Sequence, residues 1–306
     1  MNPVVTDRPE RALRLGDHLF QLRATGPDDA PDVLALHRRV FGSGATEAWY
    51  RWKYGTEASQ GHGIGEGAWC AGRLVAFCGG LPRDLHWAGQ IRPGLQVGDV
   101  MVDPDWRGLL TRRGPFFQVS SALYGRAGEM PGHGRVAFGF PNERHLHLAL
   151  RLALVWPGGP MRGLAWTARP ARTRPWSSWI SDEMDPRMPG FEAQAAAAGE
   201  RLQESLGPMR AGQRSPAYLR WRYLGRPGAD YRFLGLRRRW ARRAEGFAVL
   251  SLAEGTARWL DWIGPLDWID RAAQACRDWS HAQGAVRVEA WGSEGTSQHL
   301  LATGAD

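Results

Sequence analysis

The sequence predicts an α+β (mixed α/β) protein made of two tandem copies of one domain. A signature occurs twice, because residues 50–54 read YRWKY and residues 219–223 read LRWRY. In each half an acidic residue follows the signature by about forty positions inside a strand-like run, Asp99 in GDVMVDPDW and Asp261 in LDWIGPLDW. Both halves also present strand-like and helix-like segments in the same order. We therefore expect two units, each a mixed, mostly antiparallel sheet flanked by helices.

The composition is that of a globular protein. A chain of 306 residues is long enough for two domains with separate cores. Apolar residues make up 43% and charged residues 23%, and no apolar run approaches the roughly 18 residues of a membrane-spanning helix. The N-terminal stretch lacks a continuous apolar core, which argues against a secretory signal or an anchor. We expect no membrane association.

The cysteines indicate a reducing compartment. Cys70, Cys78 and Cys276 are too few and too scattered for a disulfide framework or a metal cluster. This predicts a cytoplasmic protein without a metal ion.

The basic residues are almost all arginine. The formal net charge is +8, and Lys53 is the only lysine. Arginine-favouring codon usage would explain this, and so would an anionic ligand, because guanidinium groups bind phosphate in a bidentate manner. The densest cluster, residues 237–243, flanks an expected loop and is typical of a solvated surface. Nucleic acid is therefore an unfavoured partner.

The first domain is expected to span residues 1–160. Residues 20–25 form a strand, and a helix carrying Val33 and Leu36 follows an N-cap aspartate and Pro31. Several antiparallel strands precede a helix over residues 116–123. A short strand at 136–140 and a helix at 142–154 complete the unit.

The second domain is expected to span residues 191–306. Residues 161–190 are rich in Pro, Arg, Trp and Ser and show no clear period, which indicates a linker packed on a domain surface. After it the order of the first copy is repeated. The expected segments are a helix at 191–206, strands at 247–252 and 257–263, a helix at 267–283, a strand at 286–291 and a terminal helix.

Residues 99–108, DVMVDPDWRG, are the most specific motif in the chain. They resemble the core motif of the GNAT superfamily of acyl-CoA-dependent N-acyltransferases, in which a strand ending in V-x-P-x-aromatic-R-G enters a turn and a helix. Residues 136–143, VAFGFPNE, resemble the next strand and the Asn-initiated helix of that family. The resemblance covers residues 18–160, and the second copy resembles the same fold without the ligand motif.

The resemblance implies that the first domain binds acetyl-CoA or a longer acyl-CoA. The pantetheine amides would pair with a free strand edge like an added strand. The pyrophosphate would lie at the N-terminus of the following helix, where unpaired N–H groups and the helix dipole favour an anion. The residues that the resemblance assigns to this site are Val100, Met101, Val102, Arg107, Gly108, Leu109, Leu110, Thr111, Arg112, Arg113 and Asn142.

The phosphate turn departs from the family pattern. Arg107-Gly108 is followed by Leu109-Leu110-Thr111, where the family has small residues. An alternative alignment lets Gly108 stand for the second glycine and shortens the turn. Because proline is tolerated at the first turn of a helix but not deep inside one, Pro115 predicts a helix that begins near Arg113 or Gly114.

The catalytic residues also depart from the family. The glutamate that many members use as a base corresponds to Gly98, so Asp99 is the nearest carboxylate and could act through water. A bonded strand residue is an equal alternative for Asp99, because Asp261 has the same place in the second copy. Asp103, before Pro104, is expected to be a turn residue.

The usual general-acid tyrosine of the family aligns with Ala149. His145 and His147 lie at the start of the same helix and titrate in a suitable range, although packing or surface roles are more common for histidine. Tyr124 is a remote substitute. Positioning and backbone stabilisation of the oxyanion can sustain acyl transfer without such an acid.

The second copy lacks the phosphate motif. Residues 263–268, IGPLDW, contain no arginine, and Asp267 would repel a phosphate. This copy is expected to have a structural role. Trp52 and Trp221 are expected to pack a helix on each sheet, with acceptor recognition by Trp52 as a minor alternative.

The sequence thus favours a cytoplasmic tandem N-acyltransferase that moves an acetyl or longer acyl group from a CoA thioester to a primary amine. An acyl carrier protein is an alternative donor. Asp99 or a water chain would take the amine proton. The alternatives are a non-catalytic GNAT-fold binding or regulatory protein and an arginine-mediated polyanion binder.

Overall fold

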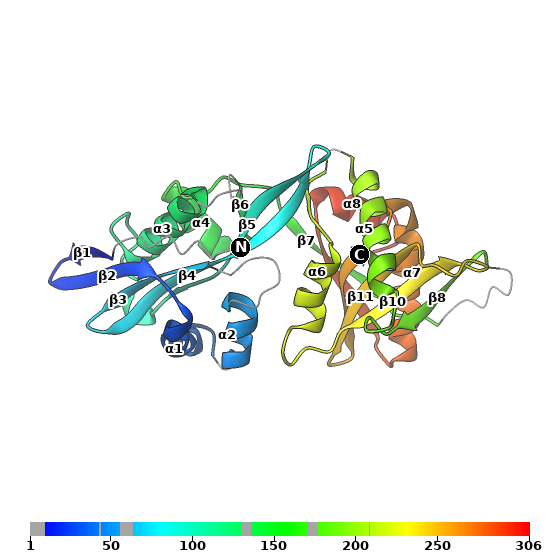
Figure 1. The fold of residues 1–306 in the computed structure, drawn as a ribbon, viewed down its shortest axis with the longest axis horizontal. Helices are drawn as coiled ribbons and strands as arrows, with labels where there is room; N and C mark the ends of the chain where they lie inside the picture. The colour runs from blue at the N-terminus through cyan, green and yellow to red at the C-terminus, as the bar shows by residue number, and fades with distance from the viewer. Residues whose placement is uncertain (1–9, 43, 56–63, 130–135, 171–176, 208) are drawn as a thin grey trace. The chain divides into compact units, whose positions relative to one another are not determined.

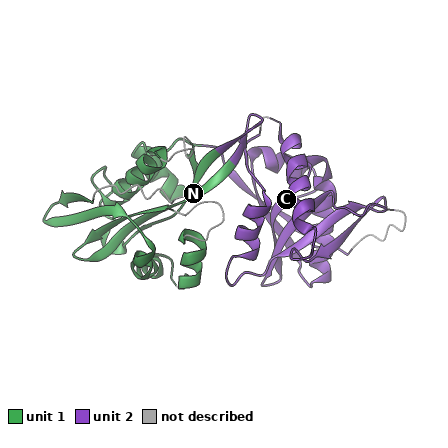
Figure 2. Cartoon of the chain, viewed as in Figure 1, with its two compact units in different colours: residues 1–84, 93–157 green, residues 85–92, 158–306 purple. Residues whose placement is uncertain are grey.

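The computed structural model divides the chain into two compact units (Figure 2). It describes residues 10–42, 44–55, 64–129, 136–170, 177–207 and 209–306. The first unit comprises Met1–Asp84 and Pro93–Pro157, and the second comprises Leu85–Arg92 and Gly158–Asp306. Among these described segments, no helix has both the length and the apolar character needed to cross a membrane.

The first unit contains a mostly antiparallel sheet with one parallel pair. Two of its strands form an antiparallel hairpin in which Cys70 pairs with Arg73. The last neighbours, β5 and β6, are parallel. In spatial order the strands are β1 (Arg11–Leu15), β2 (His18–Ala24), β3 (Ile64–Cys70), β4 (Arg73–Trp87), β5 (Gln90–Val102) and β6 (Ala137–Phe138).

Helices cover both faces of this sheet (Figure 1). On one face lie α1 (Ala30–Phe41) and α2 (Glu47–Tyr54), whose apolar side chains pack on Phe77 and Met101. On the other face lie α3 (Pro115–Glu129) and α4 (Glu143–Arg151). Since successive strand residues point to opposite faces, the sheet has a core on each side. Short 3-10 turns, η1 (Pro27–Asp29) and η2 (Pro104–Trp106), precede α1 and follow β5.

The helix starts agree with the sequence. Pro115 is the first residue of α3, one position after the predicted Gly114, and a proline there costs no hydrogen bond. Asn142 caps α4, because its side chain accepts from the backbone N–H of His145 at 2.9 Å. The helix ends at Arg151 rather than at the predicted residue 154, since Ala153 has a φ of 55°.

The second unit repeats this design with a six-stranded sheet. Its strands β12 and β13 are parallel, as β5 and β6 are, and the other pairs are antiparallel. In spatial order the strands are β7 (Met161–Thr167), β13 (Arg287–Ser293), β12 (Thr256–Ile263), β11 (Gly246–Ala253), β10 (Arg232–Arg238) and β8 (Trp179–Met184).

The helices of the second unit also lie on both faces of its sheet. On one face, α5 (Phe191–Leu206) and α6 (Pro216–Leu219) pack on β10 and β11, and a π-helical turn, η3 (Arg220–Leu224), follows α6. On the other face lie α7 (Ile269–Ala282), preceded by η4 (Leu266–Trp268), and α8 (Glu294–Leu301). A short strand, β9 (Ala211–Gly212), pairs with Leu85 and His86, the end of β4 that belongs to this unit.

Residues 161–190 are not the linker that the sequence predicted. This segment contains β7 and β8, the two edge strands of the second sheet. In β7, Leu164 and Trp166 point into the core while Thr167 is exposed. The strand partner of β7 is β13, far along the chain, so neither composition nor local periodicity reveals the pairing.

Candidate functional site

The parallel strands β5 and β6 separate after a short stretch of pairing. Leu95 pairs with Ala137 and Gln96 with Phe138, and the N–H of Leu95 donates to the carbonyl of Val136 at 2.9 Å. Beyond Gln96, β5 continues to Val102 without another β6 partner in the described part of the chain. The predicted residues Val100, Met101 and Val102 therefore lie on a part of β5 that has no β6 partner, as an added peptide-like strand requires. At the end of this stretch Arg107 Nε donates to the carbonyl of Val102 at 3.1 Å.

The turn after β5 is held by a buried carboxylate. Asp103 is fully buried, accepts from the N–H of Asp105 at 3.1 Å and pairs with Arg39 Nε at 2.7 Å. Burial raises the pKa of Asp103, but the bond from Arg39 and the backbone bond from Asp105 lower it by more. The pKa therefore lies below its usual value. The prediction that Asp103 is a turn residue is confirmed.

A set of free donors follows at residues 107–113. The backbone N–H groups of Gly108, Thr111 and Arg112 donate to no protein acceptor among the described segments. Three exposed arginines of the turn form no ion pair with a described acidic residue, namely Arg107, Arg112 and Arg113. Since free N–H groups and guanidinium groups both bind phosphate, this turn fits the pyrophosphate of CoA.

The shape of the turn depends on one of its two glycines. A Cβ atom on Gly114 would lie 1.8 Å from the carbonyl oxygen of Leu109, so only glycine fits there. A Cβ on Gly108 would meet nothing within 4 Å. The bulky residues of the turn are accommodated, with Leu109 half-buried and Leu110 exposed. Arg151 of α4 donates to the carbonyl of Leu110 at 3.3 Å.

Asp99 faces the side of the sheet that carries α1 and α2. Its φ of 51° is unusual for a residue other than glycine in a strand. The hydroxyl of Tyr54 donates to Oδ2 of Asp99 at 2.5 Å, and Lys53 Nζ lies 2.6 Å from the same oxygen. Both of these contacts come from the YRWKY signature.

Further side chains of α1 and α2 surround this pair. The ring of Trp49 lies 5.0 Å from Lys53 Nζ and 5.1 Å from the ring of His37. Burial lowers the pKa of His37, and the nearby Lys53 lowers it further while Asp99 opposes this. Burial and the Asp99 charge raise the pKa of Tyr54 well above its usual value. This group, which we call the Asp99 cluster, consists of His37, Trp49, Lys53, Tyr54 and Asp99.

His145 and His147 lie on the opposite face of the sheet from Asp99. The ring of His145 packs 5.1 Å from that of Phe116 on α3, and burial lowers the pKa of His145. His147 is exposed on α4. Val100 and Val102 of β5 point toward the cluster of Phe116 and Ala149. The structure thus places the candidate base and the candidate acids on two sides of β5 and does not bring them together.

Tyr124 lies on α3, on the same face as the histidines. It is half-buried, and burial raises its pKa to about 12. A phenol with such a high pKa is a poor proton donor near neutral pH.

The second copy repeats the contact between tyrosine and aspartate. The hydroxyl of Tyr223 donates to Asp261 at 3.0 Å, and Arg214 donates from Nε and Nη2 to the same carboxylate at 3.0–3.2 Å. Arg222, which corresponds to Lys53 in the signature, donates to Tyr231 instead at 3.3 Å. These bonds were not predicted from the sequence, although tyrosine is the fifth residue of both signatures.

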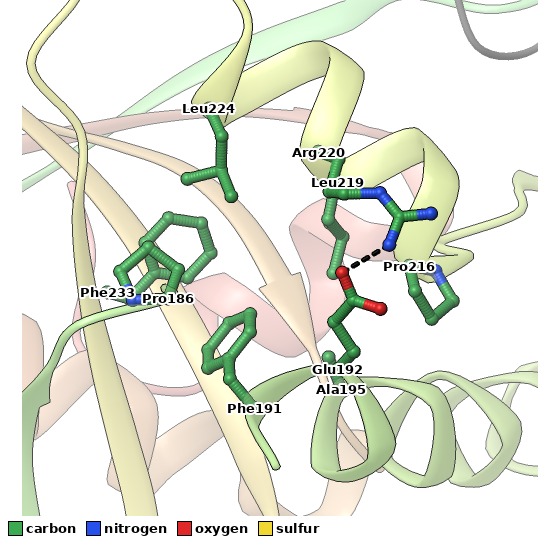
Figure 3. Close-up of a pocket in the computed structure, with 9 residues that line it drawn as sticks. All are labelled: Pro186, Phe191, Glu192, Ala195, Pro216, Leu219, Arg220, Leu224 and Phe233. Atoms are coloured by element: carbon green, nitrogen blue, oxygen red, sulfur yellow. Dashed lines mark hydrogen bonds and ion pairs between the residues drawn. The ribbon is translucent and has the colours of Figure 1, made fainter. Parts of the chain in front are cut away.

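A small hollow lies between α5, α6, η3 and β10 of the second unit (Figure 3). Phe191, Leu219 and Phe233 line it, and Glu192 and Arg220 form an ion pair at its edge. The hollow has space for about one water molecule. It is too small to bind a small-molecule substrate.

The parallel pair β5 and β6, which separates and leads into a basic turn and α3, is the arrangement that the motif at residues 99–108 predicted. Residues 21–146 match the family model described as an acetyltransferase (GNAT) domain. The matched stretch contains most of the first unit, which is thus similar to a GNAT domain. A search of curated proteins gave no match.

Solved structures share the fold across most of the chain at low sequence identity. A probable N-acyltransferase from Enterococcus faecalis V583 is 14% identical, with a TM-score of 0.66, over 89% of this chain and 64% of its own. This chain thus spans less than two thirds of that protein. A GCN5-related N-acetyltransferase from Kribbella flavida is 18% identical, with a TM-score of 0.61, over 92% of this chain and 67% of its own.

A third similar structure is N-myristoyltransferase from Saccharomyces cerevisiae, solved with bound myristoyl-CoA. It is 10% identical, with a TM-score of 0.61, over 98% of this chain and 78% of its own. Together these structures confirm the predicted α+β fold with two sheets flanked by helices.

Proposed function

We propose that the first unit is an N-acyltransferase that moves an acetyl or longer acyl group from a CoA thioester to a primary amine. The observation that carries the proposal is the unpaired edge of β5, which leads directly into a turn with free N–H groups and arginines. The GNAT family match over residues 21–146 supports the reaction class.

The donor side of the site is built by β5, the turn and α3. The edge from Val100 to Val102 would bind the pantetheine amides, and Arg107, Arg112 and Arg113 would bind the phosphates. When bound, the thioester supplies an activated acyl carbon. Asn142 caps α4, so its contribution to CoA binding is indirect, through the position of that helix.

The acceptor side is the face of β5 that carries the Asp99 cluster. A protonated primary amine must lose a proton before it attacks a thioester, and Asp99 is a carboxylate of β5 on this face. Either Asp99 or a water molecule next to it would accept this proton. Because Lys53 already pairs with Asp99, an incoming ammonium has to displace or share this contact.

The leaving thiolate lies on the other face of the sheet in this proposal. Backbone N–H groups near Val100 to Val102 would stabilise the oxyanion, which is the largest contribution in many acyl transfers. His145 is the candidate donor to the thiolate, and its low pKa means that it is neutral near pH 7 and donates less readily. Water is the alternative donor.

The compartment, the two substrates and the role of the second unit belong to the same proposal. We place the activity in the cytoplasm, because the three cysteines are free thiols. The donor is CoA or, alternatively, an acyl carrier protein, and the acceptor is an amine of unknown identity. The second unit, whose strand end lacks the arginines of the first, has a structural role and binds no CoA.

A panel of primary amines with acetyl-CoA, butyryl-CoA and palmitoyl-CoA tests the function, with thiol release and acylated amine as the readouts. Arg107→Ala should lower the rate about tenfold or more at limiting acyl-CoA, since a charged hydrogen bond contributes about 1.5–3 kcal/mol. Arg258→Ala, an exposed arginine on β12 of the second unit, is the matched control. A folded protein that acylates no amine with any donor would contradict the proposal.

A non-catalytic acyl-CoA binding protein is the second candidate. The ion pair between Lys53 and Asp99 favours it, because it occupies the carboxylate that the first proposal uses as the base. Binding of CoA without turnover of any amine would select this alternative.

A further inference from the structure

We propose that Lys53 is a self-acylation site, at which the first unit transfers an acyl group from a CoA thioester to its own lysine. The inference rests on the proposed function, because it uses the same donor site. It identifies the side-chain amine that the chain itself presents on the acceptor face.

The first argument is the contact that Lys53 makes. Its Nζ lies 2.6 Å from Oδ2 of Asp99, the carboxylate at which an acceptor ammonium would have to lose its proton. The rings of Trp49 and Tyr54 lie 5.0 and 5.9 Å from the same nitrogen. A carboxylate and two aromatic rings make an ammonium site. In this structure the amine of Lys53 occupies that site.

The second argument is the residue type. Lys53 is the only lysine among 39 basic residues, and an arginine forms the stronger ion pair with a carboxylate. The second copy uses an arginine for this purpose, because Arg214 donates twice to Asp261. If the residue beside Asp99 had only a structural role, we would expect an arginine in the first unit as well. Lysine differs from arginine in one chemical respect that matters here, since only lysine has an amine that can become a neutral nucleophile.

The third argument is the local backbone. Asp99 has a φ of 51°, whereas Asp261 is not among the residues with positive φ. Such strain in a non-glycine residue is held only where the surrounding structure enforces it, and it gathers at functional sites. The two copies therefore differ at the carboxylate and at its cation, and both differences occur in the unit that carries the donor motif.

The reaction is balanced without any further reagent. The Lys53 ammonium first gives up one proton to water through Asp99. The neutral amine then attacks the thioester carbon, a C–N bond forms, and the C–S bond breaks. The CoA thiolate leaves with the electron pair and takes up the second amine proton. The products are an amide on Lys53, free CoA thiol and one released proton.

Acylation would change the site. An amide carries no positive charge, so the ion pair with Asp99 is lost while the hydrogen bond from Tyr54 remains. Asp99 would then be free to bind another ammonium. Self-acylation at this position would therefore alter the affinity of the site for an external amine acceptor.

The test is intact-mass analysis of the full chain after incubation with acetyl-CoA, butyryl-CoA or palmitoyl-CoA. Hydroxylamine treatment removes thioesters on cysteine, and peptide mapping separates Lys53 from the N-terminal amine. We expect one stable acyl group on Lys53, formed about tenfold or more faster in the folded chain than in the urea-unfolded chain. Excess CoA without an acyl group should slow its formation. Lys53→Arg keeps the cation and should abolish the adduct.

The outcomes separate this inference from the proposed function. Calorimetric binding of acetyl-CoA and turnover of the amine panel are measured on the same preparation. Binding or turnover without an adduct on Lys53 would overturn self-acylation alone. An adduct that forms equally fast in the unfolded chain would also overturn it. If acetyl-CoA and the longer donors do not bind at all, both proposals are wrong.

Discussion

The hydroxyl of Tyr54 donates a hydrogen bond of 2.5 Å to the carboxylate of Asp99, and the second copy repeats this bond between Tyr223 and Asp261 at 3.0 Å. In each unit the repeated signature thus supplies a helical residue that binds an aspartate in the strand with a parallel neighbour, β5 or β12. The cation beside the aspartate differs, Lys53 in the first unit and Arg214 in the second. Both units share the bond between tyrosine and aspartate, while the lysine occurs in the first unit, which has the basic turn after β5.

Removing either tyrosine hydroxyl should destabilise the protein but affect acyl transfer in only one case. Tyr54→Phe and Tyr223→Phe each leave a largely buried carboxylate with one donor fewer, which costs about 1–3 kcal/mol. Urea denaturation measures this free energy of unfolding. Only Tyr54→Phe should also change the rate of acyl transfer. Equal loss of activity in both variants would show that the second copy takes part in the chemistry.

The two glycines of the phosphate turn should respond differently to alanine. Gly114→Ala forces a Cβ against the carbonyl of Leu109, so we expect a loss of more than about 1 kcal/mol of stability together with weaker CoA binding. Gly108→Ala meets open space in the protein and should leave stability unchanged. If CoA passes close to Gly108, this second variant weakens binding alone. Weaker binding of CoA without lower stability in Gly114→Ala would contradict the assigned geometry.

The stability should fall in mildly acidic solution because of two histidines. Burial lowers the pKa of His145 and of His37 in the folded chain below their usual 6.5. The unfolded chain then binds protons at a higher pH than the folded chain, so the stabilising contribution is present above about pH 6.5 and is lost as the pH falls through the folded pKa. Urea denaturation at several pH values measures this slope. His145→Gln should reduce it, and His37→Gln with His145→Gln should reduce it further. An unchanged slope in the double variant would refute the assignment.

The sequence predicted the parts of the fold that depend on local pattern. The motif at residues 99–108, the cap at Asn142 and the helix start beside Pro115 were each visible as short-range signals. The strands β7 and β8 were missed because their pairing partners lie far along the chain and edge strands tolerate proline-rich and arginine-rich surroundings.

The candidate site was predicted in part, for a similar reason. Residues 100–113 form one continuous stretch, so the resemblance of a single local motif was enough to predict a strand followed by a turn. The side chain of Asp99 and the helix that carries the histidines can lie on the same face of the sheet or on opposite faces. Which of the two holds depends on the folded sheet and cannot be taken from the spacing. The contacts of Lys53 and Tyr54 with Asp99 join residues from two elements, and no spacing rule connects them. What could have indicated them was the shared tyrosine of the two signatures.

Calorimetric titration of acetyl-CoA into the full chain tests the central claim most directly. The account predicts one binding site per chain, with an affinity that falls as salt is added, because arginine–phosphate attraction is screened. It also predicts that Arg107→Ala weakens binding about tenfold or more, while Arg258→Ala leaves it unchanged. Absence of binding, two sites per chain, or equal effects of the two variants would contradict it.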